Sequence, residues 1–294
     1  MLETHTAMHL QTLLALYANT AALRNGEVRS PLVNFNFADV KPANRAFKAV
    51  VREQKFDLAE LAIVTYMQAR AYGKPYFLMP AVIVARGQHH TIFYNPERGP
   101  LHPSGLNGRK VGVRSYTQTT GAWVRAFLQE DYGVDFRSIQ WITFEAPHVA
   151  EFADPPWVRR APEGKELLQM LLDGEIDAAI FGSEVPENTP LKPLIPDANE
   201  VAGRWADKHG GVPINHMMVI RESIAETRPD IVREVYRLLK QSAAAASANV
   251  PLRFGVETVR KPLETIIRFS EEQGLIPRRF SVDELFNDVT RALD

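Results

Sequence analysis

The chain has 294 residues, of which 45% are apolar and 23% charged, proportions typical of a soluble globular protein with about two domains. Its net charge of −1, from 34 basic and 35 acidic residues, gives no electrostatic support for binding nucleic acid or an acidic membrane surface. The absence of cysteine excludes disulfides, thiolate catalysis and cysteine-ligated metals.

The first residues lack the pattern of a secretory signal. No Lys or Arg precedes Arg24, and Gln11 and Thr12 interrupt the apolar stretch that a signal needs. We therefore expect a cytoplasmic protein, although a mature exported protein with an added Met would have a similar start. The strongly apolar run 76–85 is too short to span a bilayer, so no membrane insertion is expected.

Strands and helices alternate in the first part of the chain. The strands are expected at residues 8–17, 33–37, 56–63 and 76–85, and the helices after Thr20, from Pro42 and at 64–72. Such alternation predicts α/β units around a mostly parallel sheet. The polar run 86–90 then separates two apolar segments, which is typical of a chain that leaves one lobe for another.

The same alternation continues beyond this break. Strands are expected at residues 91–94, 110–113, 139–144, 176–181 and 213–221, with helices at 119–128 and 166–172 and in the last part of the chain. Proline-rich stretches at 146–162 and 184–196 indicate irregular connections, the second of them a return to the first lobe. Ser281 and Glu284 have the spacing of a capping box.

Residues 110–128 form a strand, a polar turn and a helix, in the order KVGVRSYTQTTGAWVRAFL. Thr119 or Thr120 can cap this helix, whose N-terminus presents unpaired N–H groups that suit a carboxylate or another small anion. The alternative is an ordinary capped helix whose hydroxyls bond only to their own backbone. Six consecutive polar residues, 115–120, exceed what one cap needs and favour a ligand site.

No standard catalytic signature is present: the chain lacks a phosphate-binding Gly-rich loop, Gly-x-Ser-x-Gly and His-Glu-x-x-His. His89 and His90 are adjacent, so on a strand they would point to opposite faces and could not chelate one ion together. A site made of His90, His216 and Glu60 stays open. The simpler interpretation, that each His is a surface or hydrogen-bonded residue, is favoured, and we expect no metal.

Three further side chains are candidates, each with an ordinary alternative. Arg86 lies at the crossover and could hold a carboxylate with its two-pronged guanidinium, or form a surface ion pair. His216 interrupts an apolar strand, as either a site residue or a satisfied core residue. Glu60 lies in an apolar segment, where it could act as an acid or be a capping or exposed residue. Tyr66 and Trp123 combine core and wall positions.

Several segments resemble a known family. They are 104–113 (SGLNGRKVGV), 172–180 (LDGEIDAAI), 56–66 (FDLAELAIVTY), 111–134 with Tyr116, Trp123 and DYGV at 131–134, and 211–221 with His216. The first two resemble the second lobe of type II periplasmic substrate-binding proteins. Together, in order and spacing, the segments resemble the 4,5-dihydroxyphthalate decarboxylase family, enzymes built on that fold.

The resemblance implies an α/β, two-lobe type II periplasmic-binding-protein-like fold with two crossovers and an interlobe cleft. The first lobe would comprise residues 1–86 and 196–294, and the second 87–195. The resemblance also implies a decarboxylase of hydroxylated aromatic acids in aromatic catabolism, with no organic cofactor. Its expected partner is a small aromatic carboxylate, and a homo-oligomer is compatible with it.

The chain departs from the family pattern at two places. The family has Asp-Tyr-Asp-Arg-Thr around its first turn, whereas this chain has Tyr17-Ala18-Asn19-Thr20, without the Arg and both acids. The family Arg that precedes the crossover His is His89 here, while Arg86 and His90 match. At least one expected carboxylate clamp is therefore missing, so the substrate could carry fewer carboxylates, or the chain could bind without catalysing.

Roles follow from what decarboxylation needs: a proton donor, a site that shields the departing carboxylate from water, and groups that bind hydroxyls. His216 and His90 are the expected donors, with Glu60 as the third catalytic candidate. The expected substrate-binding residues are Arg86, Tyr17, Asn19, Thr65, Tyr66, Tyr116, Thr119, Thr120 and Trp123. The alternative functions are the substrate-binding protein of an ABC-type uptake system and a cytoplasmic sensor of a small carboxylate.

Overall fold

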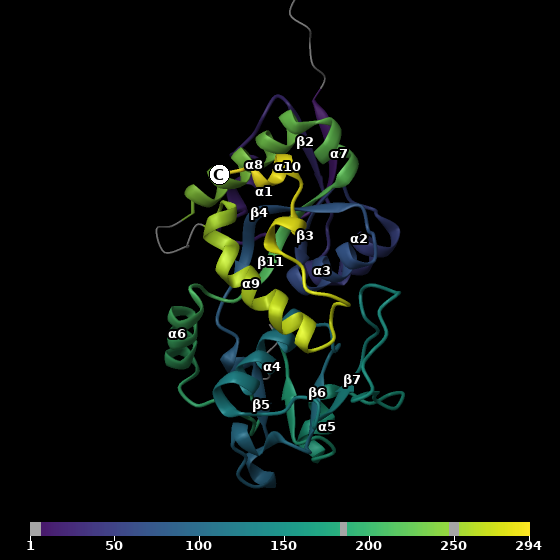
Figure 1. The fold of residues 1–294 in the computed structure, drawn as a ribbon, viewed down its shortest axis with the longest axis vertical. Helices are drawn as coiled ribbons and strands as arrows, with labels where there is room; N and C mark the ends of the chain where they lie inside the picture. Colours follow the sequence, from purple (N-terminus) through teal and green to yellow (C-terminus); the bar gives the residue numbers. More distant parts are fainter. Residues whose placement is uncertain (1–6, 183–186, 247–252) are drawn as a thin grey trace, which may run out of the picture. The chain divides into compact units, whose positions relative to one another are not determined.

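The computed structural model describes residues 7–182, 187–246 and 253–294, and the chain within them divides into two compact units (Figure 1). Unit 1 contains residues up to 85, 214–264 and 280–294, and unit 2 contains residues 86–213 and 265–279. Each unit has its own β-sheet, as the alternating sequence pattern predicts. The three residues 184–186 of the expected return connection lie outside the described residues.

The sheet of unit 1 has five strands in the order β2-β1-β3-β11-β4. They are β1 (Met8–Leu13), β2 (Val33–Phe37), β3 (Leu58–Ala62), β4 (Tyr76–Ala85) and β11 (Ile214–Arg221). β1 pairs in parallel with β2 and β3, whereas β11 runs antiparallel to both β3 and β4. The late strand β11 therefore enters the middle of a sheet whose other strands come from the first 85 residues.

Short helices connect the strands of unit 1, and a longer one covers its core. The helices are α1 (Ala21–Arg24), α2 (Phe47–Glu53), α3 (Ile63–Ala71), α7 (Glu222–Thr227), α8 (Pro229–Ala244) and α10 (Asp288–Arg291). In α8, Ile231, Val235 and Leu239 recur at helical spacing and pack with Leu10 and Met218 of the sheet. The predicted capping box is confirmed: Ser281 and Glu284 cap the short 3₁₀ helix Val282–Leu285.

The sheet of unit 2 has six strands in the order β10-β5-β9-β6-β7-β8. They are β5 (Ile92–Tyr94), β6 (Lys110–Val113), β7 (Gln140–Thr143), β8 (Val158–Arg160), β9 (Ala178–Ile180) and β10 (Lys192–Pro193). β6 pairs in parallel with β7 and β9, and β7 with β8, whereas β5 is antiparallel to its two neighbours. Strand β8 lies within the stretch that the sequence analysis treats as irregular.

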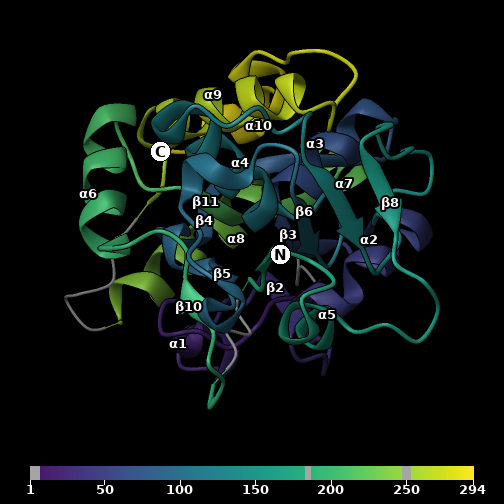
Figure 2. The ribbon, with the colours of Figure 1, turned by 90° about the horizontal axis from the view of Figure 1, so that it is seen from below.

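Helices α4 (Thr119–Tyr132) and α5 (Leu167–Asp173) cover opposite faces of this sheet (Figure 2). Alternation along β6 shows this, because the Cβ position of Gly112 meets the Leu167 side chain of α5, whereas the next residue, Val113, contacts Gly121 of α4. A side chain at position 112 would lie 2.5 Å from Leu167, so the close packing of α5 requires glycine there.

The division into units differs from the expected lobes, because residues 196–213 and 265–279 belong to unit 2. The first segment contains α6 (Ala198–His209), and the second is the end of α9 (Val256–Glu272). Trp205 of α6 is buried, and its ring meets Phe127 of α4 edge-on at 4.5 Å between centroids. The sequence analysis missed α6 because Trp205 is its one buried residue, so no apolar stripe marks it.

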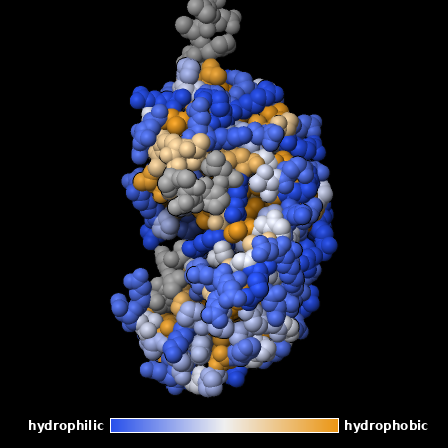
Figure 3. All heavy atoms as spheres, turned by 90° about the vertical axis from the view of Figure 1, so that its left-hand side faces the viewer, coloured by the Kyte–Doolittle hydropathy of each residue, from blue (hydrophilic) through white to orange (hydrophobic). Residues whose placement is uncertain are grey.

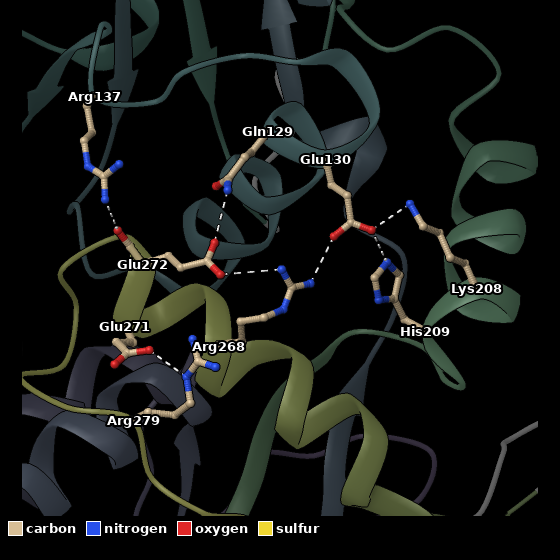
Figure 4. A network of polar contacts seen from close by, with 9 residues as sticks. All are labelled: Gln129, Glu130, Arg137, Lys208, His209, Arg268, Glu271, Glu272 and Arg279. Atoms are coloured by element: carbon tan, nitrogen blue, oxygen red, sulfur yellow. Dashed lines mark hydrogen bonds and ion pairs between the residues drawn. The ribbon is translucent and has the colours of Figure 1, made fainter.

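A polar network joins the same three helices (Figure 4). Glu130 of α4 accepts from Lys208 at 2.6 Å and from Arg268 of α9 at 3.0 Å, and lies 3.0 Å from His209 Nε2. Burial by itself raises the pKa of Glu130, but the hydrogen bonds from Lys208 and Arg268 bring it below its ordinary value. These ion pairs connect three segments that are far apart in the sequence, which explains why the expected boundaries were displaced.

Polar side chains cover most of the face in Figure 3, and its apolar groups are scattered. Of the large apolar side chains in the described ranges, Leu16 alone is strongly exposed, at 51%. No helix in the described part of the chain combines the length and the apolar character needed to cross a membrane.

Candidate active site

Glu60 of β3 is the centre of a polar cluster in unit 1. Its side chain is fully buried, and its Oε1 atom accepts a hydrogen bond from the Tyr17 hydroxyl at 2.7 Å and lies 2.8 Å from His216 Nδ1. Its Oε2 atom accepts from the backbone N–H of Ala15 at 2.8 Å. Three donor groups therefore converge on one carboxyl group, which is the environment of an ionised, acceptor-only carboxylate.

Strand register brings Glu60 and His216 together. Residue 218 of β11 lies opposite Glu60, and His216 lies opposite Ala62. Since side chains on one face recur every second residue, Glu60 and His216 are diagonal neighbours on the same face of the sheet. The apolar strand interrupted by His216 thus has a specific partner for that imidazole, 156 residues earlier in the chain.

His216 combines a fixed nitrogen with a partly exposed ring. A carboxylate can only accept, so the contact with Glu60 places a hydrogen on Nδ1 and leaves Nε2 for other partners. The side chain is 20% exposed, and its ring meets Phe47 edge-on at 5.3 Å between centroids. The arrangement can hold an imidazolium next to a buried negative charge and present its second N–H outward.

The first turn supplies this cluster with further contacts. Thr20 Oγ1 accepts from the backbone N–H of Tyr17 at 2.8 Å and donates to the carbonyl of Ala15 at 2.7 Å, which fixes the turn. Asn19 Nδ2 donates to the carbonyl of Ile83 at 3.0 Å. Tyr17 and Asn19 are thus brought to the Glu60 end of the sheet, although Asn19 spends its amide on the backbone.

Thr65 and Tyr66 lie on α3 and are both buried. The Tyr66 hydroxyl donates to the carbonyl of Leu285 and accepts from the N–H of Leu78 at 3.1 Å. Burial raises the pKa of Tyr66 well above its usual range. Its hydroxyl is therefore used within the core of unit 1, while its binding role stays a prediction.

Arg86 and His90 belong to unit 2 and begin it. The backbone N–H of Arg86 donates to the carbonyl of Pro213 at 3.0 Å, so the two chain segments that enter and leave the unit are paired. Burial and then the charge of Arg86 lower the pKa of His90. At neutral pH His90 is therefore mostly uncharged, which suits a hydrogen-bond partner better than a proton donor.

His89, which replaces an arginine of the family pattern, is fully buried. Its ring stacks on Phe127 at 3.7 Å between centroids, and neither ring nitrogen has a hydrogen-bond partner. Burial, with a smaller contribution from His90, lowers the pKa of His89 to about 4. This histidine is a neutral core residue and cannot replace the charge of an arginine.

The polar turn before α4 is present, but its cap differs from the prediction. Gln118 is the N-cap residue, and Thr119 and Thr120 lie in the first turn, so the expectation that one of them caps the helix is wrong. No side chain bonds to the exposed N–H groups as a cap. Tyr116 and Trp123 are fully buried, and the Tyr116 hydroxyl donates to the carbonyl of Gln273 at 3.2 Å and accepts from Trp157 at 2.9 Å.

Two residues near these groups were not recognised from the sequence. Arg125 is fully buried beside Tyr116, and Leu16 is exposed between Ala15 and Tyr17. The helical spacing of Arg125 from Gly121, at the turn that the sequence does highlight, was the only available signal. Leu16 continues an apolar strand, so nothing in its sequence context distinguishes it from a core residue.

The described residues contain no group of three or more His, Asp or Glu side chains that could hold a metal ion. His216 and Glu60 meet, but they do so as a hydrogen-bonded pair. The expected roles of the other site residues stay predictions.

Comparison with known proteins identifies relatives over most of the chain. It is 30% identical over 252 residues to a 4,5-dihydroxyphthalate decarboxylase from Comamonas testosteroni, covering 81% of this chain and 76% of that protein. It is also 30% identical over 181 residues to a 4,5-dihydroxyphthalate decarboxylase from Pseudomonas putida, covering 59% of this chain and 70% of the relative. No protein-family model matches the chain.

Solved structures define the fold. The Escherichia coli periplasmic aliphatic sulphonate-binding protein SsuA matches with a TM-score of 0.59 at 12% identity, covering 96% of this chain and 92% of that one. The alkanesulfonate-binding protein SsuA from Xanthomonas axonopodis pv. citri matches with 0.58 at 12%, covering 96% and 98%. The desulfurization enzyme DSZB matches with 0.58 at 12%, covering 95% and 97%. The chain has the periplasmic-binding-protein fold, as the sequence resemblance implies.

Proposed function

Because the chain belongs to the 4,5-dihydroxyphthalate decarboxylase family, we propose that it decarboxylates a hydroxylated aromatic acid related to 4,5-dihydroxyphthalate. The observation that carries the proposal is the pair formed by buried Glu60 and partly exposed His216, 2.8 Å apart. This pair provides the proton donor that the reaction requires, on a fold that also accommodates an enzyme in the case of DSZB.

The chemistry requires protonation of a ring carbon. Loss of CO₂ from an aromatic acid leaves an electron pair on the ring carbon, unless that carbon has first received a proton. In 4,5-dihydroxyphthalate each carbon that carries a carboxylate has a hydroxyl in the para position, which donates electrons and makes this protonation easier. The protein must then supply a proton at that carbon and hold the carboxylate away from water.

We assign the donor role to His216. Protonated His216 transfers its Nε2 proton to the carboxylate-bearing carbon; the bond to the carboxylate then breaks, its electron pair returns to the ring, and CO₂ leaves. The neutral imidazole that remains keeps its Nδ1 hydrogen on Glu60 and regains a proton from solvent. Glu60 stabilises the imidazolium and fixes its orientation, so in this proposal it positions the donor and does not donate itself.

The other expected residues bind the substrate in this proposal. Arg86 holds a carboxylate with its guanidinium, and the hydroxyls and N–H groups at Thr119 and Thr120 receive a polar edge. His90, whose pKa is lowered, acts as a hydrogen-bond partner in its neutral form. Tyr17, Asn19 and the remaining predicted residues line the same substrate, with Leu16 as an added apolar contact.

The proposal includes a cytoplasmic location, supported by family relatives named as decarboxylases and not as transport receptors. Fractionation of the native host should place the protein with cytoplasmic markers. Recovery of the protein in the periplasm would favour the alternative function, a substrate-binding protein of an uptake system.

The test is CO₂ release from a panel of hydroxybenzoates and hydroxyphthalates by the wild type and His216→Ala. Removing a general acid should lower kcat by roughly two to four orders of magnitude. In D₂O, the wild-type product should carry one deuterium at the carbon that lost CO₂. His9→Ala is the matched control, since His9 is an exposed histidine of the same sheet, and it should turn over at the wild-type rate.

Two outcomes would contradict the proposal. Wild-type turnover by His216→Ala would show that His216 is only a strand residue. Tight binding of one panel member without CO₂ release would favour the receptor or sensor function instead.

A further inference from the structure

The turn before α4, residues 115–120, is here called the anion loop. The N–H of Gln118 bonds to Ser115 and that of Ala122 bonds to Gln118, so the N–H groups of residues 119–121 form the first helical turn. The first N–H groups of a helix have no partner within it and carry its positive end. The side-chain oxygen of Gln118, at the N-cap, is also buried without a partner.

Arg125 lies directly against this turn and is fully buried. Its Nη2 donates to the carbonyl of Tyr116 at 2.8 Å, and its Nε donates to the side-chain oxygen of Gln273 at 2.7 Å. Its guanidinium lies 4.0 Å from the centroid of the Tyr116 ring. Two hydrogen bonds and one ring contact therefore hold the cation in a fixed position under the anion loop.

The remaining nitrogen of Arg125 has no partner. Nη1 is buried without a hydrogen bond, and it lies 3.2 Å from the point where a Cβ of Gly121 would be. The free prong of the guanidinium is thus aimed at the first turn of α4, and glycine at position 121 makes room for it. This buried donor is an observation independent of the helix terminus itself.

The charge of Arg125 has no close counter-ion. In the described part of the chain, no carboxylate oxygen lies within 4.0 Å of its guanidinium, and Gln273 and Tyr116 offer it only neutral acceptors. Asp154 acts on it from a longer distance, and Asp154 itself lies 4.0 Å from Arg160. Burial lowers the pKa of Arg125 to about 10, so it stays protonated at neutral pH.

We infer that Arg125 is a positioning residue that supplies a fixed positive charge beneath the anion loop, where a carboxylate of the aromatic substrate binds. A buried cation without a counter-ion costs several kcal/mol, and an anion held at the adjacent N–H groups offsets that cost. Arg125 acts through the loop and does not touch the substrate. The inference rests on the proposed function, because it takes the ligand from it.

The test measures equilibrium binding of 3,4-dihydroxybenzoate and of its neutral isostere, 3,4-dihydroxybenzamide, by calorimetry. The benzoate is what remains when 4,5-dihydroxyphthalate loses one CO₂. The quantity compared is the preference for the acid over the amide, because a purely structural role would change both affinities together. A unit charge about 6–8 Å away at an effective dielectric constant of about 20 corresponds to a preference of roughly 10- to 100-fold.

Four variants separate charge from structure. Arg125→Met removes the charge, and Gln273→Glu neutralises it with a carboxylate on Nε; both should lower the preference by roughly 10- to 100-fold. Arg125→Lys keeps the charge and Gln273→Leu removes the same hydrogen bonds without adding charge, so both should keep the preference within about threefold. If Arg125→Met does not fold, Gln273→Glu against Gln273→Leu decides the question.

The inference is overturned if Arg125→Met or Gln273→Glu keeps the wild-type preference, or if the wild type shows no preference for the acid. Failure of the proposed function is a separate result: the wild type would release no CO₂ from 4,5-dihydroxyphthalate. In that case a preference for the acid that depends on Arg125 would still support the anion loop as a carboxylate site.

Discussion

Each unit buries a charged side chain completely, but the two charges are treated in opposite ways. Glu60 in unit 1 is surrounded by donors, one of them the imidazole of His216. Arg125 in unit 2 is bound to neutral acceptors and an aromatic ring, and one of its nitrogens has no partner. The comparison teaches that the charge of Glu60 is directed at a residue of the protein, whereas the charge of Arg125 is available to a ligand.

The largest expected effect comes from removing the charge of Glu60. Glu60→Gln keeps the size of the side chain but places an amide where three donors converge, so His216 loses the anion that stabilises its protonated form. We expect kcat for decarboxylation to fall by roughly two to three orders of magnitude, with little change in KM. Steady-state kinetics and far-UV circular dichroism measure this, and a folded variant with wild-type kcat would remove Glu60 from the mechanism.

Acid should affect unit 2 through His89, which is buried in its neutral form. Its pKa in the folded protein, about 4, lies below the ordinary 6.5, so between these values the unfolded chain binds a proton that the folded protein does not. The contribution of His89 to stability is therefore complete above about pH 6.5 and is lost as the pH falls towards 4. Between pH 7.5 and pH 5 this amounts to about 2 kcal/mol.

Urea unfolding at the two pH values checks this prediction. His89→Leu, which keeps an apolar side chain of similar volume against Phe127, should lose about 2 kcal/mol less than the wild type over that range. His102→Leu is the control, because His102 is exposed. An equal pH dependence in the wild type and His89→Leu would show that His89 is not the acid-sensitive group.

A smaller effect is expected from the Glu130 network, which holds α6 and the end of α9 on α4. Because these side chains are partly exposed, water and salt weaken their attraction, and Glu130→Gln should cost only about 1 kcal/mol of unfolding free energy. The loss should shrink in high salt, whereas Arg204→Gln, which breaks an exposed pair within α6, should cost almost nothing. A salt-independent loss would mean that packing, and not charge, holds α6.

The smallest expected effect tests how many donors Glu60 needs. Tyr17→Phe removes the hydroxyl at 2.7 Å but leaves the contacts from Ala15 and His216. One neutral hydrogen bond contributes about 1 kcal/mol or less, so kcat should fall roughly threefold to fivefold. A loss as large as that of Glu60→Gln would assign Tyr17 a direct role at the substrate.

Much of the secondary structure follows from local pattern. The strand Tyr76–Ala85 begins and ends at the expected residues, and the strand–turn–helix unit at 110–128 is present as expected. These elements have strong apolar periodicity and clear breaks, which are properties of neighbouring residues. Helix α6 lacks that periodicity, because Trp205 is its one buried residue, and it was therefore missed.

The candidate site divides in the same way. The sequence by itself determined the family, the α/β character, and the three polar residues His216, Glu60 and Arg86 as candidates, because each is conspicuous beside its own neighbours. Only the tertiary structure decided that Glu60 pairs with His216, since that contact depends on the register of β3 against β11. It alone also placed Arg125 under the anion loop, because a buried arginine and an exposed one look the same in a helical pattern; burial depends on what the rest of the chain packs around it.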